Sequence, residues 1–517
     1  RSETQLALQC VERKSDMSKP TYLGFPDSLD HPERWPPNDC SLIDSGDTAW
    51  MLVSTALVFF MTPGLAFFYA GLIHRRSVIT IMMQCFISLG IVSCLWFLIG
   101  FSLAFGETSR NIIGNPSSYP LFLNLDLCTP VGYPMWPATG TIPAIIFAGY
   151  QMLFAVITPA VIAGAFADRF RFGPFLLFLA LWSLLVYCPF AHWVWSPNGY
   201  LFQWGVRDFA GGIVVHIAAG WSALGSVLFT GSRHFDSEHD RLIANTPHNR
   251  TFVALGVGIL WFGWCGFNGA AGGESNGVAA YALTNSCISA GAGMLTWLAV
   301  EQHHTGKPSL VGACIGLVCG LATVGCSAGY IRPWAAFLVG SVAGPWCYAA
   351  IELRKAFKLD DALDVWGVHG AGGLLGSTLL GCLADEGING MGRSGAFFGK
   401  QLCASVWTAF YSCAMTYLIL TLINLVTPIL PTKDQLRAGL DVSLHNELAY
   451  DEDAVKHARG LLSHVECAPA CKDGAPEDIQ VVGDAGHPTA GGAAAPPPAA
   501  LPVFQQTTPA LPQTGCA

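Results

Sequence analysis

The chain of 517 residues contains 61 Asp, Glu, Lys and Arg residues, or 12%, whereas soluble domains carry about 25%. These charges concentrate at the ends: residues 1–48 hold 14 and residues 433–517 hold 16, which leaves 31 in the 384 residues between. With 52% hydrophobic residues and a mean hydropathy of +0.45, this pattern excludes a string of soluble domains. The net charge of −9 and the lack of a Lys/Arg-rich run argue against nucleic acid as a partner.

Eleven apolar runs are long enough to cross the lipid bilayer as helices, which takes about 20 residues each. The sequence therefore predicts an all-α polytopic membrane protein. The predicted spans are 49–73, 78–105, 141–167, 174–195, 208–230, 251–271, 278–300, 309–329, 333–351, 362–384 and 396–426.

Basic residues in the short loops predict the orientation of these spans. Loops after odd-numbered spans hold eleven Lys and Arg residues, whereas loops after even-numbered spans hold four. By the positive-inside rule the N-terminus lies outside and the C-terminus lies in the cytoplasm. The chain is then divided into an outer segment (1–48), the eleven-helix domain (49–432), a charged cytoplasmic tail (433–460) and a low-complexity tail (461–517) that is expected to be disordered.

Twelve of the 18 cysteines lie within apolar runs, where thiols act as small hydrophobic groups rather than as a disulfide framework. Cys10, Cys40 and Cys128 fall in the predicted outer segments, an oxidising compartment. A Cys10–Cys40 disulfide is open on this basis, although spacing alone cannot establish it. The sequence contains no His-Glu-x-x-His or Walker motif, and no cofactor or metal is expected.

Two apolar segments keep ionisable residues, which are costly in a membrane and usually face a cavity. One runs from Asp208 to His216 and the other from Asp364 to His369, each on a glycine-rich stretch. Because spans five and ten cross in opposite directions, the segments enter from opposite faces. This predicts two inverted five-helix repeats plus a final helix, with the substrate path between the repeats. The alternatives are helix-packing histidines and an intramembrane enzyme that uses these residues as metal ligands.

Aromatic side chains recur on the neighbouring spans. Tyr150 and Phe154 are four residues apart on span three and share a helix face. Trp195 ends span four, and Trp264 and Phe267 lie on span six. Lipid contact or an interfacial belt explains most membrane aromatics and is the alternative for each.

Five stretches resemble the ammonium transporter family of Amt, Mep and Rh proteins, and the likeness extends over about residues 47–450. They are TPGLAFFYAG (62–71), QMLFAVITPA (151–160), DFAGG (208–212), GWCGFN (263–268) and DVWGVHG (364–370). The eleven spans and Trp195 favour the Amt branch, of plant or algal type, over a Rh-like gas channel. The resemblance implies a plasma-membrane homotrimer with one pore per subunit, and a transporter rather than an enzyme.

The resemblance also implies roles for individual residues. In the family, two stacked phenylalanines close the outer pore above a pair of histidines, and the matching residues here are Phe154, Phe267, His216 and His369.

An outer recruitment site is implied as well, with Trp195 beside the first phenylalanine and Asp208 as support from behind. Trp264 would line the lumen, and Asp364 would play the matching structural role inside. Ala271 stands where many members carry a serine hydroxyl, so one recruitment hydrogen bond is missing.

Moving a cation into apolar surroundings costs tens of kcal/mol. Each aromatic face that contacts the cation returns only about 2 kcal/mol. The sequence therefore predicts that NH₄⁺ is recruited outside and deprotonated, and that neutral NH₃ crosses the pore. A separate relay of the released proton by the histidines is left open by the sequence, and so is net charge movement. An ammonium sensor of the same fold with little flux is the alternative.

Residues 439–450 are similar to the family's regulatory tail, with Asn446 where a glycine is usual. Ser443 aligns with a threonine that is phosphorylated in plant members. The resemblance implies a kinase or signalling partner at this tail, and an ordinary tail serine is the alternative.

Overall fold

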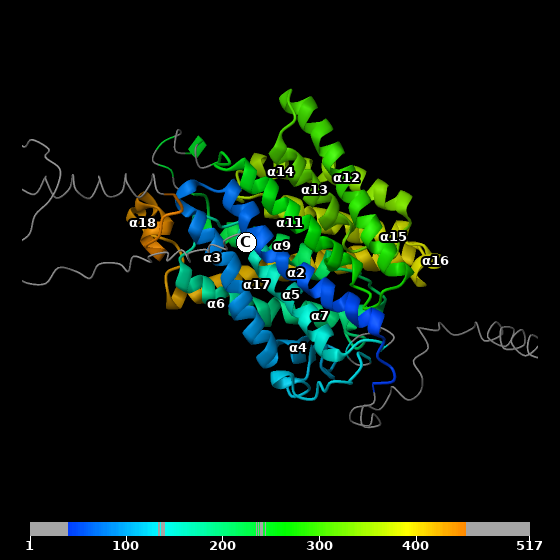
Figure 1. Ribbon diagram of the computed structural model, residues 1–517. Coiled ribbons are helices and arrows are strands. Elements are labelled where there is room, and N and C mark those ends of the chain that lie inside the picture. Colours follow the sequence, from blue (N-terminus) through cyan, green and yellow to red (C-terminus); the bar gives the residue numbers. More distant parts are fainter. Residues whose placement is uncertain are drawn as a thin grey trace, which may run out of the picture. The chain divides into compact units, whose positions relative to one another are not determined.

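The computed structural model describes residues 40–450 except 133–134, 136–139, 234, 236, 238–240 and 243–244. This part of the chain is almost entirely helical (Figure 1). Its one two-stranded sheet pairs β1 (Thr108–Ser109) with β2 (Ile113–Gly114) in antiparallel fashion. Cys10, most of the outer segment and the low-complexity tail lie outside the described residues.

The first half of the helical domain covers the predicted spans one to five. In chain order its helices and helical turns are α2 (Ser45–Leu72), η3 (Arg75–Ser77), α3 (Val78–Leu95), η4 (Trp96–Gly100), α4 (Phe101–Phe105), η5 (Pro120–Phe122), α5 (Ala144–Ile162), α6 (Phe172–Trp182), η6 (Ser183–Tyr187), α7 (Cys188–Trp195), α8 (Tyr200–Trp204), η7 (Gly212–Ile217) and α9 (Ala218–Thr230).

The second half covers spans six to eleven and the start of the tail. Its elements are α11 (Arg250–Gly269), α12 (Gly277–Thr305), α13 (Leu310–Val324), α14 (Pro333–Ala356), η8 (Trp366–Ala371), α15 (Gly372–Leu383), α16 (Glu386–Asn389), α17 (Gly395–Val426), α18 (Lys433–Ala438) and η9 (Asp441–His445).

Nine helical segments in the described part are long and apolar enough to cross a membrane. The other two predicted spans correspond to α13, which has 15 residues, and to η8 followed by α15. The chain is thus an all-α polytopic membrane protein. The count of eleven spans and their orientation stay predictions.

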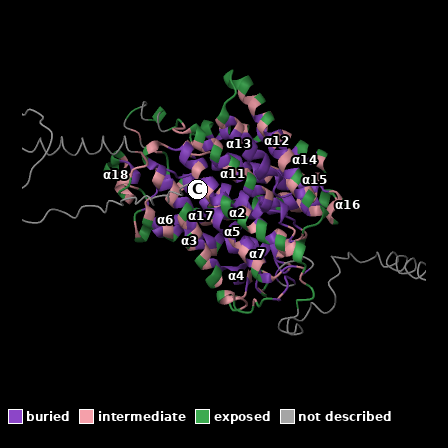
Figure 2. Cartoon of the chain, viewed as in Figure 1, coloured by how far each residue is buried: buried purple, intermediate pink, exposed green. Residues whose placement is uncertain are grey.

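The two halves repeat one packing pattern. α2, α3 and α5 contact one another in the first half, and α11, α12 and α13 do so in the second. α2 and α11, the first helices of the two halves, pack closely because Gly64 and Gly256 let their backbones approach. Buried residues gather inside the bundle, and many of the exposed side chains are Leu, Phe and Trp, which suits helices facing lipid (Figure 2).

Spans five and ten start later than predicted, at Gly212 and Trp366 rather than at residues 208 and 362. The chain before each helix is unwound, and Gly211 and Asp364 adopt left-handed φ values of 94° and 58°. Unwound backbone at membrane depth needs partners within the protein. Phe209 and Ala210 find them by donating their N–H groups to the carbonyls of residues 326 and 325, at 3.1 and 2.9 Å. These carbonyls are available because α13 ends at Val324, five residues before the predicted end of span eight.

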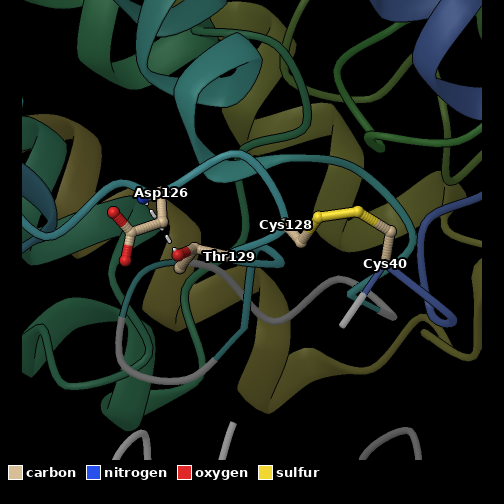
Figure 3. Close-up of a disulfide and its surroundings, with 4 residues drawn as sticks. All are labelled: Cys40, Asp126, Cys128 and Thr129. Carbon is tan, nitrogen blue, oxygen red and sulfur yellow. Dashed lines mark hydrogen bonds between the residues drawn. A yellow bond between two sulfur atoms is a disulfide. The ribbon is translucent and has the colours of Figure 1, made fainter. Parts of the chain in front are cut away.

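The disulfide in the structure joins Cys40 to Cys128, which rules out the Cys10–Cys40 pairing that the sequence left open (Figure 3). The start of α2 lies beside the loop that leads into α5, where the N–H of Asp44 donates to the carbonyl of Thr141 at 2.8 Å. This contact joins segments almost 100 residues apart in the chain, and Cys40 and Cys128 lie on the same two segments. Sequence spacing does not record it.

Candidate functional site

His216 and His369 meet where the two halves cross. They lie on η7 and η8, single π-helical turns that begin the helices of predicted spans five and ten. Their Nδ1 atoms are 3.2 Å apart, and both side chains are buried. One Nδ1 must donate and the other accept, so the neutral pair shares one proton between its rings.

The crossing is close because glycines occupy it. A Cβ atom on Gly220 would stand 2.1 Å from the backbone N of Gly370, and one on Gly373 would stand 2.9 Å from the carbonyl oxygen of Gly212. Glycine allows helix backbones to approach in this way. The crossing therefore brings the two histidines within hydrogen-bonding distance.

A column of aromatic rings continues from the histidine pair. The rings of Phe154 and Phe267 are stacked, with centroids 3.8 Å apart and planes 13° apart. The ring centroid of Phe267 lies 6.4 Å from that of His216. The ring centroid of Trp264 lies 5.9 Å from that of Phe267 and 5.7 Å from that of His216. The two phenylalanine rings are in van der Waals contact, so passage between them requires one ring to turn aside.

Tyr150 fixes this stack from behind. Its ring centroid lies 4.9 Å from that of Phe154, and its hydroxyl donates to the carbonyl oxygens of Phe267 at 2.7 Å and Gly266 at 3.0 Å. A single side chain of α5 thus holds the backbone of α11 next to the stacked rings. The hydroxyl is used in this contact and is directed at backbone.

Trp195 and Ala271 lie at the far side of the stack from the histidines. The Trp195 ring stands edge-on to Phe154 at 5.8 Å, and its indole N–H donates to the carbonyl oxygen of Asp208 at 2.9 Å. Ala271 follows the end of α11, one turn beyond Phe267, and contributes no hydroxyl.

The carboxylate of Asp208 holds the start of η7. It accepts backbone N–H groups from Gly211, Gly212, Ile213 and Val214 at 2.7 to 3.0 Å. These are the amides that have no partner at a helix N-terminus. Asp208 therefore positions the turn that carries His216 and supports Trp195 through its carbonyl.

In the second half the equivalent carboxylate belongs to Asp361, which the sequence reasoning missed. Asp361 is buried and accepts the N–H of Trp366, five residues on, at 2.7 Å, just as Asp208 accepts that of Ile213 at 2.7 Å. The predicted counterpart, Asp364, instead pairs with Arg354 at 2.7 Å. The signal was available, because Asp361 precedes His369 by eight residues and Asp208 precedes His216 by eight.

Two buried polar atoms beside the column, Nε2 of His216 and Nε1 of Trp264, have no hydrogen-bond partner within the described part of the chain. Buried donors and acceptors normally have one. Their rings are neighbours, so a small polar molecule passing the histidines could bond to either atom.

Ser443 lies apart from this column, on η9 in the tail. Its hydroxyl donates to the carbonyl oxygen of Gln435 at 3.3 Å. Two residues earlier, the buried carboxylate of Asp441 accepts the N–H groups of Ile79 and Thr80 at 3.1 and 2.8 Å, at the start of α3. Asn446 ends η9 with a φ of 55°, a conformation that glycine adopts freely and that asparagine also tolerates.

Comparison with known proteins identifies the family of the chain. Residues 49–450 match the model of the Ammonium Transporter Family. A putative ammonium transporter of Methanothermobacter thermautotrophicus is 41% identical over 79% of this chain and 99% of that protein, and an ammonium transporter of Bacillus subtilis is 39% identical over the same shares.

Solved structures share the fold. The crystal structure of Candida albicans Mep2 matches with a TM-score of 0.69 at 32% identity, over 76% of this chain and 88% of that one. The structure of a sensor Amt protein matches with a TM-score of 0.70 at 24% identity, a likeness of fold alone. The chain therefore belongs to the ammonium transporter family, a family of multi-pass membrane transport proteins and not of enzymes.

Proposed function

We propose that the chain conducts ammonia across the plasma membrane by recruiting NH₄⁺ at Trp195 and Phe154, removing a proton, and passing NH₃ between the stacked rings and along the histidine pair. The observation that carries the proposal is the 3.2 Å contact between His216 and His369 at the end of a buried aromatic column. We further propose the family's homotrimer as the assembly.

The energetics favour deprotonation before passage. Moving an ammonium-sized ion into apolar surroundings costs tens of kcal/mol. Each aromatic face returns about 2 kcal/mol when desolvated. The rings can hold a hydrated cation at the mouth of the column but cannot carry it through. Neutral ammonia avoids most of this cost, and potassium cannot lose its charge in the same way, so selectivity follows from the chemistry of the ion.

The histidine pair suits the transfer of both ammonia and its proton. A neutral imidazole has one donor and one acceptor nitrogen, and its unperturbed pKa of about 6.5 lets it gain and lose a proton readily. With the Nδ1 atoms bonded to each other, Nε2 of His216 is free to bond to ammonia. A proton taken up at one ring can leave from the other through the shared hydrogen bond.

A measurement of ammonium flux distinguishes a transporter from an ammonium sensor. Full-length protein in a cell that lacks its own ammonium uptake should restore growth on low ammonium, and the protein in lipid vesicles should carry net ammonium flux. Saturable ammonium binding without flux would support a sensor of the same fold instead.

For the tail we propose that phosphorylation of Ser443 by a kinase undocks η9 and lowers conduction. The support is electrostatic, because a phosphate brings a charge of about −2 close to the buried carboxylate of Asp441, and like charges repel. Ser443→Asp should therefore reduce uptake, whereas Ser443→Ala should leave it unchanged. Equal uptake by Ser443→Asp and wild type would reject this role.

A further inference from the structure

Gly325 lies beside the edge of the His216 ring that faces away from His369. It directly follows α13 and is buried. A Cβ atom added to Gly325 would stand 3.5 Å from both Nε2 and Cδ2 of His216, and 3.4 Å from the carbonyl oxygen of Ala322. These are the three nearest atoms, and all lie at ordinary van der Waals distances. The absent side chain therefore leaves a space that holds one methyl group.

Neither the backbone nor the packing requires a glycine at this position. Gly325 has a φ of −52° and a ψ of −39°, a right-handed helical conformation that is open to other residues. By contrast, a Cβ atom on Gly212 would stand 2.4 Å from that of Cys326, and one on Gly376 would stand 1.8 Å from the carbonyl oxygen of Thr323. Glycine in a helical conformation is less stable than alanine. The fold alone therefore gives no reason for a glycine at position 325.

Hydrogen bonds hold the backbone around this space in place. The carbonyl oxygens of Gly325 and Cys326 accept the N–H groups of Ala210 and Phe209, at 2.9 and 3.1 Å. Both donors belong to the unwound segment before η7, the turn that carries His216. Gly325 is thus tied to the segment that positions the histidine, which keeps the space at the edge of the ring.

The ring nitrogen that borders the space is the one that can bond to substrate. Nδ1 of His216 is bonded to His369, whereas the buried Nε2 has no partner within the described residues. An amine nitrogen that is hydrogen-bonded to Nε2 lies about 2.9 Å from it. With a C–N bond of about 1.46 Å and tetrahedral angles, a methyl carbon on that amine stands about 3.6 Å from Nε2. This distance matches the 3.5 Å at which a Cβ atom of residue 325 would lie.

We propose that Gly325 sets the size limit of the column at the histidine pair, because it leaves room for the methyl group of methylamine while the amine nitrogen bonds to Nε2 of His216. The inference rests on the proposed function. Methylammonium would lose one proton to water at the outer mouth, and the N–H bonding electrons would stay on nitrogen as the lone pair of the neutral amine. That amine can donate to Nε2 or accept from it.

An alanine at position 325 would remove this room. Its methyl group would occupy the place of the methylamine carbon, whereas ammonia has no carbon and needs none of the space. One carbon that a site cannot accommodate changes a rate by about 10-fold to 200-fold. Gly325→Ala should therefore lower methylammonium flux at least about tenfold more than it lowers ammonium flux.

The test uses full-length protein in lipid vesicles and measures the fluxes of ammonium and of radiolabelled methylammonium in the same preparation. Wild type should carry both ions. Gly325→Ala should lower the ratio of methylammonium flux to ammonium flux by at least about tenfold. Gly258→Ala on α11 is the matched control, since its added Cβ would have no atom within 4 Å, and it should keep the wild-type ratio.

Thermal unfolding in detergent gives a readout that does not depend on flux. The Tm of Gly325→Ala should equal or exceed that of wild type, because alanine fits the position and has fewer conformations in the unfolded chain. A lower Tm would show that the fold needs this glycine and would overturn the inference.

Two flux results would also overturn the inference while leaving the proposed function intact. One is a wild-type protein that carries ammonium but excludes methylammonium, and the other is an unchanged flux ratio in Gly325→Ala. A wild-type protein that carries neither ion would instead contradict the proposed function, and the inference would fall with it.

Discussion

At the scale of single residues, the rings of the column are held by hydrogen bonds from behind. The hydroxyl of Tyr150 bonds to the carbonyl of Phe267, and the indole of Trp195 bonds to the carbonyl of Asp208. Each bond uses a polar tip on an otherwise apolar side chain, which is how buried Tyr and Trp are usually satisfied.

Tyr150→Phe tests this arrangement by removing one oxygen and keeping the ring. A typical buried hydrogen bond contributes about 1 kcal/mol, so the free energy of unfolding should fall by about that amount. Because the hydroxyl is directed at backbone, the maximal rate of ammonium uptake should fall while the apparent affinity stays the same. A weaker apparent affinity with an unchanged maximal rate would mean that the hydroxyl contacts ammonium directly.

The sequence indicated the column residues through motif resemblance, and the structure brings Phe154, Phe267, His216 and His369 into one row. Their transport roles stay predictions. The sequence could not indicate the Tyr150 hydroxyl bond, because its acceptor is a backbone carbonyl more than 100 residues away. The role of Asp361 could have been predicted from the sequence. Asp364, which is nearer to His369 along the chain, was matched with Asp208 instead.

At the scale of helices, the important feature is the crossing of the continuous segment η7–α9 with η8, where Gly220 of α9 lies against Gly370 of η8. Gly220→Ala should force the two apart, because the added Cβ would stand 2.1 Å from the backbone of Gly370. Overpacking of this kind costs about 1 to 3 kcal/mol. Separation of the Nδ1 atoms should also reduce ammonium flux in vesicles by more than the loss of folded protein explains.

Gly291→Ala on α12 is the matched control, since no atom lies within 4 Å of the position its Cβ would take. It should leave stability and flux close to those of wild type. If Gly220→Ala gave the same flux per folded molecule as this control, the close crossing would not set the geometry of the histidines.

The sequence predicted these helices from their apolar length, but not where they are broken. The unwound residues before Gly212 depend on carbonyls beyond the end of α13, so the break comes from tertiary contacts. A hydropathy pattern indicates neither the unwound N–H groups nor the carbonyl groups to which they bond. The same limit explains why span eight was predicted to continue to residue 329.

At the scale of the whole domain, the loops after predicted spans three, five and nine are tied together by ion pairs. Arg233 binds Asp360 at 2.9 Å and lies 3.7 Å from Asp168, and Arg169 lies 3.6 Å from Asp360. The tail is bound to the start of α3, directly after the loop that follows span one, through the carboxylate of Asp441. Which side of the membrane this face occupies stays a prediction.

Burial alone would raise the pKa of Asp360, but the hydrogen bonds and charge of Arg233, with the charge of Arg169, lower it to about 2. In the unfolded chain the pKa of an aspartate is about 3.9. The ionised carboxylate of Asp360 therefore contributes its full stabilisation of the fold at pH values above about 3.9. This stabilisation, about 2 kcal/mol, is lost as the pH falls from about 4 to about 2.

Thermal unfolding of Asp360→Asn in detergent should therefore show a lower Tm than wild type at pH 7, and the gap should narrow as the pH falls below about 4. Glu352→Gln, which removes an exposed carboxylate of α14, is the control and should change the Tm little. A gap of constant size from pH 7 to pH 3 would contradict the assigned pKa.

The Cys40–Cys128 disulfide also belongs to this scale. The sequence placed Cys40 and Cys128 in predicted outer segments, an oxidising compartment. It did not indicate that these two cysteines pair, because the pairing depends on how the start of α2 lies beside the loop before α5. Composition and the length of the apolar runs predicted the class of fold. Contacts between distant segments determined its details.

The most direct measurement compares ammonium flux with potassium flux in lipid vesicles that carry wild type, His216→Ala or His369→Ala. Loss of the histidine pair should lower ammonium flux by about 100-fold, the usual contribution of a positioned acid or base, or allow potassium to leak through. Full ammonium flux with no potassium leak in either variant would contradict the claim that ammonium gives up its proton at these two rings.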